Sequence, residues 1–513
     1  MADESRSRKS LRNGVYSASL LMVNLILGFV ARGVFIRHVG VDFLGLNTSV
    51  EGILGLLNVA ELGVSYAIAS SLYGPMASGD RVAVAELVAI QGWVYRRVAL
   101  FIAVASLLML PFFPAIFPDA TFPLGYAYAA FAVYLFGSLL GFFVNYKMVV
   151  LEVSQEAYKV TLATRVPNAL RTVLQIVALA FTDHGYEWWL ALNVVCSVVV
   201  SVAISRFVSL GHPYLTVPVS AGGALRRRYP QVAARVGQMM FHRIAGVALR
   251  QSSSVILLAY ASLADVGVYG NYMLIFTGVS LLIESLFSGV QAGVGNLLHT
   301  SARGHSLAVF AELLALRVCV GAVAAFGFYF VSPPFVSLWV GSQYVMGGVP
   351  LLLLSLILFI DVSRSAVEAF ICAKGCFSDV WAALAEVVLN VGFSVLFGRY
   401  WGLAGILAGV LISLVVIVLG WKPYFLFRVN MRCGFRDYWR AYALSLAEAA
   451  ALAVIFSAAM SLLPCSLTCF ESLAAMVCAT CIFAVSLFAV LGASSSGGSH
   501  LLSRLVALLR SRL

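Results

Sequence analysis

The chain has 513 residues, of which 62% are hydrophobic and only 11% are charged, and its formal net charge at pH 7 is +11. A water-soluble domain carries charge on roughly a quarter of its residues, so this composition excludes a soluble protein. Apolar runs of about 20 residues, the length that spans a bilayer, recur along the whole chain. We therefore expect an all-α polytopic membrane protein.

Hydropathy predicts fourteen membrane spans, which cover residues 14–36, 44–71, 98–118, 122–145, 160–182, 186–206, 239–260, 267–298, 309–331, 343–363, 379–398, 402–426, 441–463 and 472–492. In chain order, the predicted parts are a cytoplasmic tail (1–13), an N-terminal six-helix lobe (14–206), a cytoplasmic inter-lobe linker (207–238), a C-terminal six-helix lobe (239–426), a basic cytoplasmic loop (427–440), two additional helices (441–492) and a cytoplasmic amphipathic tail (493–513). An even number of spans places both termini on one side of the membrane.

The distribution of Lys and Arg gives the orientation. With a cytoplasmic amino terminus, nearly all basic residues outside the spans fall in cytoplasmic connections, and only Arg37 and Arg399 lie at outer ends. This asymmetry is the positive-inside rule, so we place both termini in the cytoplasm. The basic charge then reflects topology and attraction to anionic membrane lipids. No basic stretch forms a motif that reads nucleic acid, and no nucleic-acid partner is expected.

The segment "LYGPMASGD" ends the second span. We expect Pro75 to end that helix and Ser78 or Asp80 to begin a separate amphipathic helix, "RVAVAELVAI", along the membrane surface.

The chain contains an internal repeat. With small gaps, Gly45 aligns with Gly267 and Glu61 with Glu284, at a nearly constant separation in sequence. Six predicted spans separate the paired helices, so both copies enter the membrane in the same direction. We expect two pseudo-symmetric lobes related as a parallel repeat.

Polar residues form one stripe in each copy of the repeat. The stripes comprise Asn47, Glu51, Asn58, Glu61 and Ser65 in the second span, and Ser280, Glu284, Ser288 and Gln291 in the eighth. A charge inside a span costs about 2.5–3.5 kcal/mol, so it normally faces a bundle interior or a water-filled cavity. Two interpretations stay open: the stripes line a lumen, or they hydrogen-bond neighbouring helices. Glu61 and Glu284 correspondingly either carry protons or hold helices together.

Cationic residues inside the spans are candidates for a substrate-binding cavity. They are Arg32 in the first span, Arg37 at its outer end, Arg171 in the fifth span and Arg250 in the seventh. Arg32 and Glu51 lie at similar depth, so the two side chains either pair or leave Arg32 free for an anion, for which its fork geometry suits phosphate. Four further arginines are expected to snorkel to the cytoplasmic interface: Arg165, Arg243, Arg317 and Arg364.

The sequence lacks the motifs of soluble enzymes. It has no G-x-x-x-x-G-K-[ST] loop, no H-E-x-x-H and no G-x-S-x-G, and its predicted external loops are short. We expect a transporter without metal or cofactor. Cys465 and Cys469 share a short external turn, where they either form a disulfide or belong to an ordinary helix end.

The segment "ARGVFIRHVGVDFLGLNTSVEGILGLLNVAELGVSYAIASSLYGPMASGDR" resembles the amino-terminal signature of Wzx-type polysaccharide flippases, in the multidrug/oligosaccharidyl-lipid/polysaccharide (MOP) exporter superfamily. The matching elements are Arg32 with Phe35, the Gly-x-x-x-Leu-Gly-Leu turn at 40–46, Ala-Glu-Leu-Gly at 60–63 and Leu-Tyr-x-Pro at 72–75. Lipid II flippases of the same superfamily are similar around "ARGVFIRHVG". The superfamily has a MATE-like plan of two lobes, which fits the predicted spans.

The resemblance implies a function as well as a fold. It implies a flippase that moves polyprenyl-diphosphate-linked oligosaccharides to the outer leaflet of the bacterial plasma membrane by alternating access, for surface polysaccharide biosynthesis. By the same resemblance Arg32 binds the substrate phosphate, and polysaccharide-assembly glycosyltransferases or a polymerase are plausible partners. The alternatives are a cation-coupled drug exporter of the same superfamily and a membrane-embedded glycan polymerase or ligase.

Overall fold

The structure, a computed structural model, describes residues 2–58, 62–117, 122–154, 156–230, 255–260, 262–287, 303–374, 379–430, 435–461 and 468–494. The regular secondary structure of these residues is entirely helical, and nine helical segments among them are long and apolar enough to cross a membrane. The all-α, polytopic fold class is thus confirmed, while the count of fourteen spans stays a prediction.

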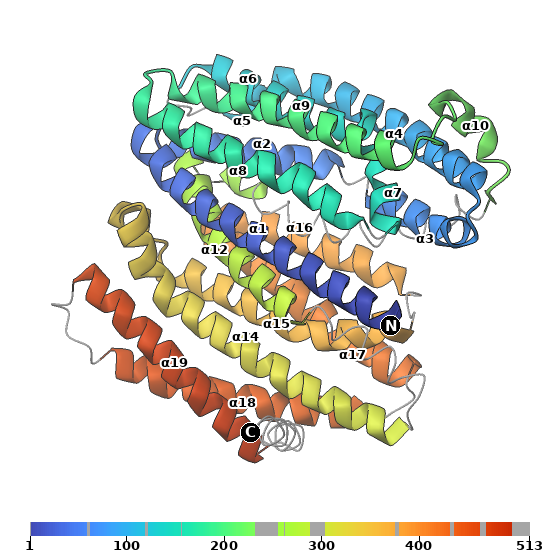
Figure 1. Ribbon diagram of the computed structural model, residues 1–513. Helices are drawn as coiled ribbons and strands as arrows, with labels where there is room; N and C mark the ends of the chain where they lie inside the picture. The colour runs from blue at the N-terminus through green and yellow to red at the C-terminus, as the bar shows by residue number, and fades with distance from the viewer. Residues whose placement is uncertain are drawn as a thin grey trace. The chain divides into compact units, whose positions relative to one another are not determined.

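The chain divides into two compact units, Met1–Gly267 and Val268–Leu513. The main helices of the first unit are α1 (Ala2–His38), α2 (Val41–Leu57), α3 (Leu62–Ser78), α4 (Arg81–Met109), α5 (Phe113–Ile116), α6 (Leu124–Phe143), α7 (Met148–Val153), α8 (Ala157–Phe181), α9 (Gly185–Gly211) and α10 (Gly222–Leu225). Within it, α1 packs along α8, and α9 packs against both α8 and α6 (Figure 1).

The division between the units falls within α12 (Leu263–Phe287). The helices that follow are α14 (Arg303–Trp339), α15 (Gly348–Lys374), α16 (Val380–Ser413), α17 (Lys422–Tyr424), α18 (Phe435–Met460) and α19 (Cys469–Ser494). Two wider, π-helical segments, Leu414–Trp421 and Phe425–Asn430, flank α17. In the second unit α14 packs against α15, α18 and α19.

The predicted second span, 44–71, is covered by two helices. The helix α2 ends at Leu57 with Asn58 as its C-cap, and α3 begins at Leu62. Asn is a poor residue for a helix interior because its side chain bonds elsewhere. Here the Asn58 amide oxygen accepts a hydrogen bond of 2.8 Å from the Ser138 hydroxyl on α6.

The start of α4 corrects two expectations. Pro75 does not end its helix: α3 continues to Ser78, and Gly79, with a φ of 75°, supplies the turn that ends it. Asp80 does cap the next helix, because its carboxylate accepts a hydrogen bond of 3.0 Å from the Ala83 amide. However, α4 runs unbroken to Met109 with buried residues in its first turns, so there is no separate surface helix.

The long element α16 contains two antiparallel segments, as the predicted spans 379–398 and 402–426 require. Gly402 has a φ of 54° and marks the turn between them. The Ser394 hydroxyl donates a hydrogen bond of 3.0 Å to the carbonyl of Ile406 across the hairpin. A Cβ atom at Gly409 would collide with the backbone of residue 394, so this glycine permits the close approach of the two segments.

Candidate functional site: a cationic cluster in the first unit

The helix α1 presents Arg32 to the interior of the first unit. Phe35, three residues later, is fully buried, with its ring 4.8 Å from that of Trp189 and 6.0 Å from that of Tyr186 on α9. Residues three apart lie on neighbouring faces of a helix, so this packing holds Arg32 beside the polar residues of the unit. Its Nη2 atom donates a hydrogen bond of 3.4 Å to the carbonyl of Gly267.

Glu51 on α2 lies close enough to both Arg32 and Arg171 to interact with them electrostatically, and it accepts a hydrogen bond from Tyr134 of α6. The Glu51 residue is exposed. Of the two interpretations of Arg32, the structure favours interaction with Glu51.

Arg171 on α8 is the second cation of this cluster. Its Nη1 atom donates a hydrogen bond of 2.9 Å to the amide oxygen of Asn193 on α9, and Asn193 in turn donates to the carbonyl of Trp189 at 3.0 Å. The Nε atom of Arg171 is buried and has no hydrogen-bond partner within the described part of the chain. A guanidinium group has five N–H donors, so Arg171 keeps donor capacity for another acceptor.

The other described members of the α2–α3 stripe lie against helices of their own unit. Asn47 is buried and accepts a hydrogen bond of 2.9 Å from the Tyr186 hydroxyl, while Asn58 accepts from Ser138. Ser65 is half-buried. Asn47 and Asn58 thus fit the interpretation in which the stripe forms hydrogen bonds with neighbouring helices. Glu51, in contrast, is exposed.

Several predicted site residues lie outside the residues described by the structure. They are Glu61, Arg250, Ser288 and Gln291, together with Arg243, Cys465 and the tail from residue 495 onward. Arg37 is described and lies exposed near the end of α1.

The second unit has a different charge arrangement. On α15, the Nη2 atom of Arg364 lies 2.7 Å from Asp361, and its Nε atom lies 3.7 Å from Glu368. Lys422 on α17 adds a 3.2 Å contact to Glu368. Cations and carboxylates therefore neutralise each other locally.

The expected snorkelling of Arg317 and Arg364 is wrong in this structure. Arg317 is only 7% exposed, and its guanidinium lies 3.8 Å from the centre of the Phe287 ring. Arg364 forms ion pairs with Asp361 and Glu368 of its own helix. Carboxylates and an aromatic face within the bundle stabilise both charges, so neither side chain has to reach the interface.

Two members of the α12 stripe are described. The Ser280 hydroxyl is buried without a hydrogen-bond partner among the described residues. Glu284 is exposed and lies within electrostatic reach of Arg317 and Arg364. Glu284 thus lies near the ion pairs that Arg364 and Lys422 form in the second unit.

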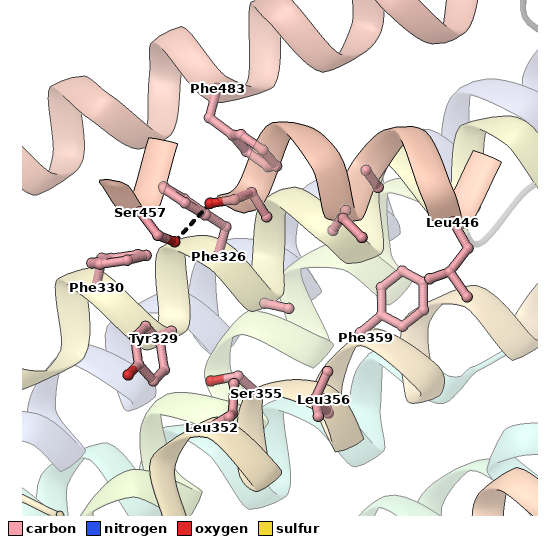
Figure 2. A pocket seen from close by; sticks show the side chains of 15 residues that line it. Phe326, Tyr329, Phe330, Leu352, Ser355, Leu356, Phe359, Leu446, Ser457 and Phe483 are labelled. Atoms are coloured by element: carbon pink, nitrogen blue, oxygen red, sulfur yellow. Dashed lines mark hydrogen bonds between the residues drawn. The ribbon is translucent and has the colours of Figure 1, made fainter. Parts of the chain in front are cut away.

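A cavity of about 500 Å³ lies between α14, α15, α18 and α19. Figure 2 shows its lining, in which Phe326, Phe330, Phe359 and Phe483 dominate. The hydroxyl of Ser457 is already bonded to the carbonyl of residue 453, at 2.6 Å. The cavity therefore has the chemistry to receive hydrocarbon.

Sequence reasoning missed two partners in the first cluster, Tyr134 and Asn193, and the partner of Arg364, Glu368. The sequence does contain a feature that could have identified Asn193, because an amide in an otherwise apolar span needs a hydrogen-bond partner. Tyr134 had none, because its helix "YAYAAFAVYLFGS" contains several tyrosines that hydropathy does not distinguish.

Known structures share this fold. A lipid II flippase, MurJ, in an inward closed conformation matches 93% of this chain and 99% of its own, with a TM-score of 0.64 and 14% identity. An inward-facing multidrug resistance MATE family transporter of the MOP superfamily matches 79% of this chain and 97% of its own, with a TM-score of 0.60 and 13% identity.

A MATE transporter of Vibrio cholerae, VcmN, matches 82% of this chain and 97% of its own, with a TM-score of 0.53 and 13% identity. No family model and no curated sequence matches the chain. At these identities the comparisons establish the fold, which is the one shared by MATE transporters and MurJ.

Proposed function

We propose that this protein is a flippase for polyprenyl-diphosphate-linked oligosaccharides, which it moves from the cytoplasmic to the outer leaflet of the bacterial plasma membrane for surface polysaccharide assembly. The observation that carries the proposal is the cluster of Arg32 and Arg171 around Glu51 inside the first unit. Among the described residues, two guanidinium groups lie around this one carboxylate, so the cluster has a net positive charge. Arg is the side chain best suited to a diphosphate, since it forms paired hydrogen bonds with phosphate oxygens.

The substrate's three chemical parts each need a different environment. A glycan cannot cross hydrocarbon unaided, because each unsatisfied hydroxyl costs a few kcal/mol to desolvate. Asn193, Tyr134 and Glu51 offer hydrogen-bonding groups at the cationic cluster. The prenyl tail needs only an apolar environment, which the bilayer provides.

The structural comparisons favour a flippase within the shared fold. Both MATE matches are almost complete for the MATE chains but leave about a fifth of this chain unmatched. The MurJ match extends over nine tenths of this chain. The lipid II flippase thus matches a larger share of this chain than either of these two MATE transporters does.

Transport would proceed by alternating access of two lobes, driven by the proton gradient or the membrane potential. Glu61 and Glu284 stay the candidates for proton coupling that the repeat suggests. Polysaccharide-assembly glycosyltransferases or a polymerase are the proposed protein partners, because they would make and consume the lipid-linked unit.

A cation-coupled drug exporter is the second candidate, since the structural neighbours include MATE transporters. A site for cationic drugs requires a net negative interior, whereas Arg32 and Arg171 give the first unit the opposite sign. A glycan polymerase or ligase is the candidate from a different class, and the neighbours with this fold are transporters.

A deletion strain distinguishes the three candidates. For a flippase, mass analysis of its lipid extract finds complete oligosaccharide units on polyprenyl diphosphate, accumulated on the cytoplasmic face. An unchanged lipid pool with increased drug sensitivity would replace the proposal with drug export. Single units accumulating on the outer face would replace it with polymerisation.

A further inference from the structure

A segment that follows α9 is fastened to the surface of α4. We call residues 212–229, which contain α10, the strap. A Cβ atom at Gly222 would lie 2.6 Å from both the carbonyl oxygen of Ala89 and the Cβ of Trp93. At Gly223, a Cβ atom would lie 2.9 Å from the indole nitrogen of Trp93. The two glycines therefore let the strap backbone lie directly on α4.

Hydrogen bonds to Glu86 hold the end of the strap against α4. This carboxylate is only 8% exposed and accepts hydrogen bonds from Arg228 at 2.8 Å and from the Tyr229 hydroxyl at 2.6 Å. Burial and the neighbouring carboxylate raise the pKa of Tyr229 to about 12, so the phenol stays protonated and donates at neutral pH. The strap thus has a fixed position on the first unit.

This fixed position brings two arginines to one aromatic ring. The guanidinium of Arg97, one turn along α4, lies 3.9 Å from the centre of the Trp93 ring. The guanidinium of Arg226, from the strap, lies 5.6 Å from the same centre. Each contact is attractive, but together they hold two positive charges close to each other. Both side chains are exposed, so an anion that reached them would relieve their mutual repulsion.

Arg97 also heads an exposed apolar stripe on α4. At 3, 4, 7 and 11 residues after Arg97 lie Leu100, Phe101, Val104 and Leu108, and all four are exposed. Residues at this spacing share one face of a helix. A bare apolar face on a helix long enough to cross a membrane contacts lipid chains. Arg97 and Trp93 therefore lie at the level of the lipid headgroups, where Trp and Arg are favoured.

We propose that Trp93, Arg97 and Arg226 form a binding site for an anionic phospholipid of the leaflet on the basic side of the protein. The headgroup phosphate lies between the two guanidinium groups, and an acyl chain lies along the stripe from Leu100 to Leu108. The bound lipid connects the strap to α4, in addition to the hydrogen bonds that Glu86 accepts from Arg228 and Tyr229. This inference does not depend on the transported substrate.

The apolar stripe decides between a phospholipid and a free phosphate ion. A soluble anion would use the arginines alone, whereas a lipid also covers the four exposed side chains below them. The paired guanidinium groups of Arg97 and Arg226 disfavour a zwitterionic headgroup, which carries an ammonium group of its own. An acidic phospholipid matches both the charge and the stripe.

The test measures which lipids stay bound to the purified protein. The full chain is exchanged into mixed micelles with equal amounts of phosphatidylglycerol and phosphatidylcholine, and the retained lipids are counted by mass spectrometry. The wild-type protein retains phosphatidylglycerol preferentially. Arg97→Gln and Arg226→Gln each reduce that preference about fivefold, as expected for a surface charge that contributes about 1 kcal/mol.

Arg227→Gln is the matched control, because it removes the same charge from the neighbouring, exposed position of the strap. Its preference stays at the wild-type level. An equal decrease in all three variants would reduce the site to general surface charge and overturn the proposal. Wild-type protein that binds inorganic phosphate but shows no preference between the two lipids would likewise overturn it, in favour of a free-anion site.

Discussion

The two units handle their internal charges in opposite ways. Among the described residues of the first unit, Glu51 is the carboxylate that interacts with both Arg32 and Arg171, and the Nε atom of Arg171 has no hydrogen-bond partner. In the second unit, Arg364 lies between Asp361 and Glu368 on its own helix. The first arrangement leaves an excess of positive charge among the described residues, whereas the second neutralises its cations locally.

This difference separates two roles that a buried arginine can have. An arginine held by carboxylates stabilises the fold, because removing it leaves buried negative charges without a partner. An arginine held mainly by amides and carbonyls, like Arg171 through Asn193, can exchange a neutral acceptor for an anionic ligand.

The largest expected change in stability comes from Arg364→Gln in the second unit. Loss of one partner from a buried pair costs about 3–5 kcal/mol, and partial exposure of these side chains lowers our expectation to about 2 kcal/mol. Thermal unfolding in detergent measures the change. Arg171→Gln in the first unit is the matched comparison and changes the melting temperature much less. Equal losses would remove the distinction between the units.

A smaller loss is expected for Tyr186→Phe in the first unit. The substitution removes the 2.9 Å hydrogen bond to Asn47 and leaves a buried amide oxygen unsatisfied, at a cost of about 1–2 kcal/mol. If this contact is structural, the melting temperature falls while the transport rate of the remaining folded protein is unchanged. A selective loss of transport would instead assign Asn47 to the substrate path.

The smallest effect is expected for Glu51→Gln, measured as affinity for inorganic pyrophosphate by isothermal titration. Glu51 offsets the positive charge of Arg32 and Arg171, so its neutralisation should strengthen anion binding about fivefold, or about 1 kcal/mol. Glu152→Gln, at an exposed position in α7, is the control and leaves the affinity unchanged. Weaker binding in Glu51→Gln would show that Glu51 supports the ligand and does not oppose it.

The sequence predicted those features that depend on composition, helix period and local capping. It indicated the all-α membrane fold, the cap at Asp80 and the similar depth of Arg32 and Glu51, because each follows from residue type or from the rise along a helix. It did not predict that Arg317 lies over Phe287 or that Arg364 is paired within its bundle. Hydropathy gives the depth of a residue but does not identify the neighbouring helix that it faces.

The same limit applies to the strap and to the polar stripes. The glycines at 222 and 223 and the arginines that follow them read as a solvated loop, because Trp93, which they contact, is distant in sequence. Likewise, the period of 3.6 residues placed Asn47, Glu51 and Asn58 near one face. Only their partners on α6 and α9 separate the two bonded amides from the accessible carboxylate.

The most direct test of the central claim, that Arg32 binds the diphosphate of a transported lipid, is a transport assay with purified protein. Proteoliposomes carry a fluorescent polyprenyl-diphosphate oligosaccharide, and the transfer rate between leaflets is measured for wild type, Arg32→Gln and Arg165→Gln, an exposed arginine on α8. We predict that Arg32→Gln lowers the rate about a hundredfold, or about 2.7 kcal/mol, the range of charge-assisted hydrogen bonds, while Arg165→Gln stays close to wild type. A wild-type rate in folded Arg32→Gln would contradict the account.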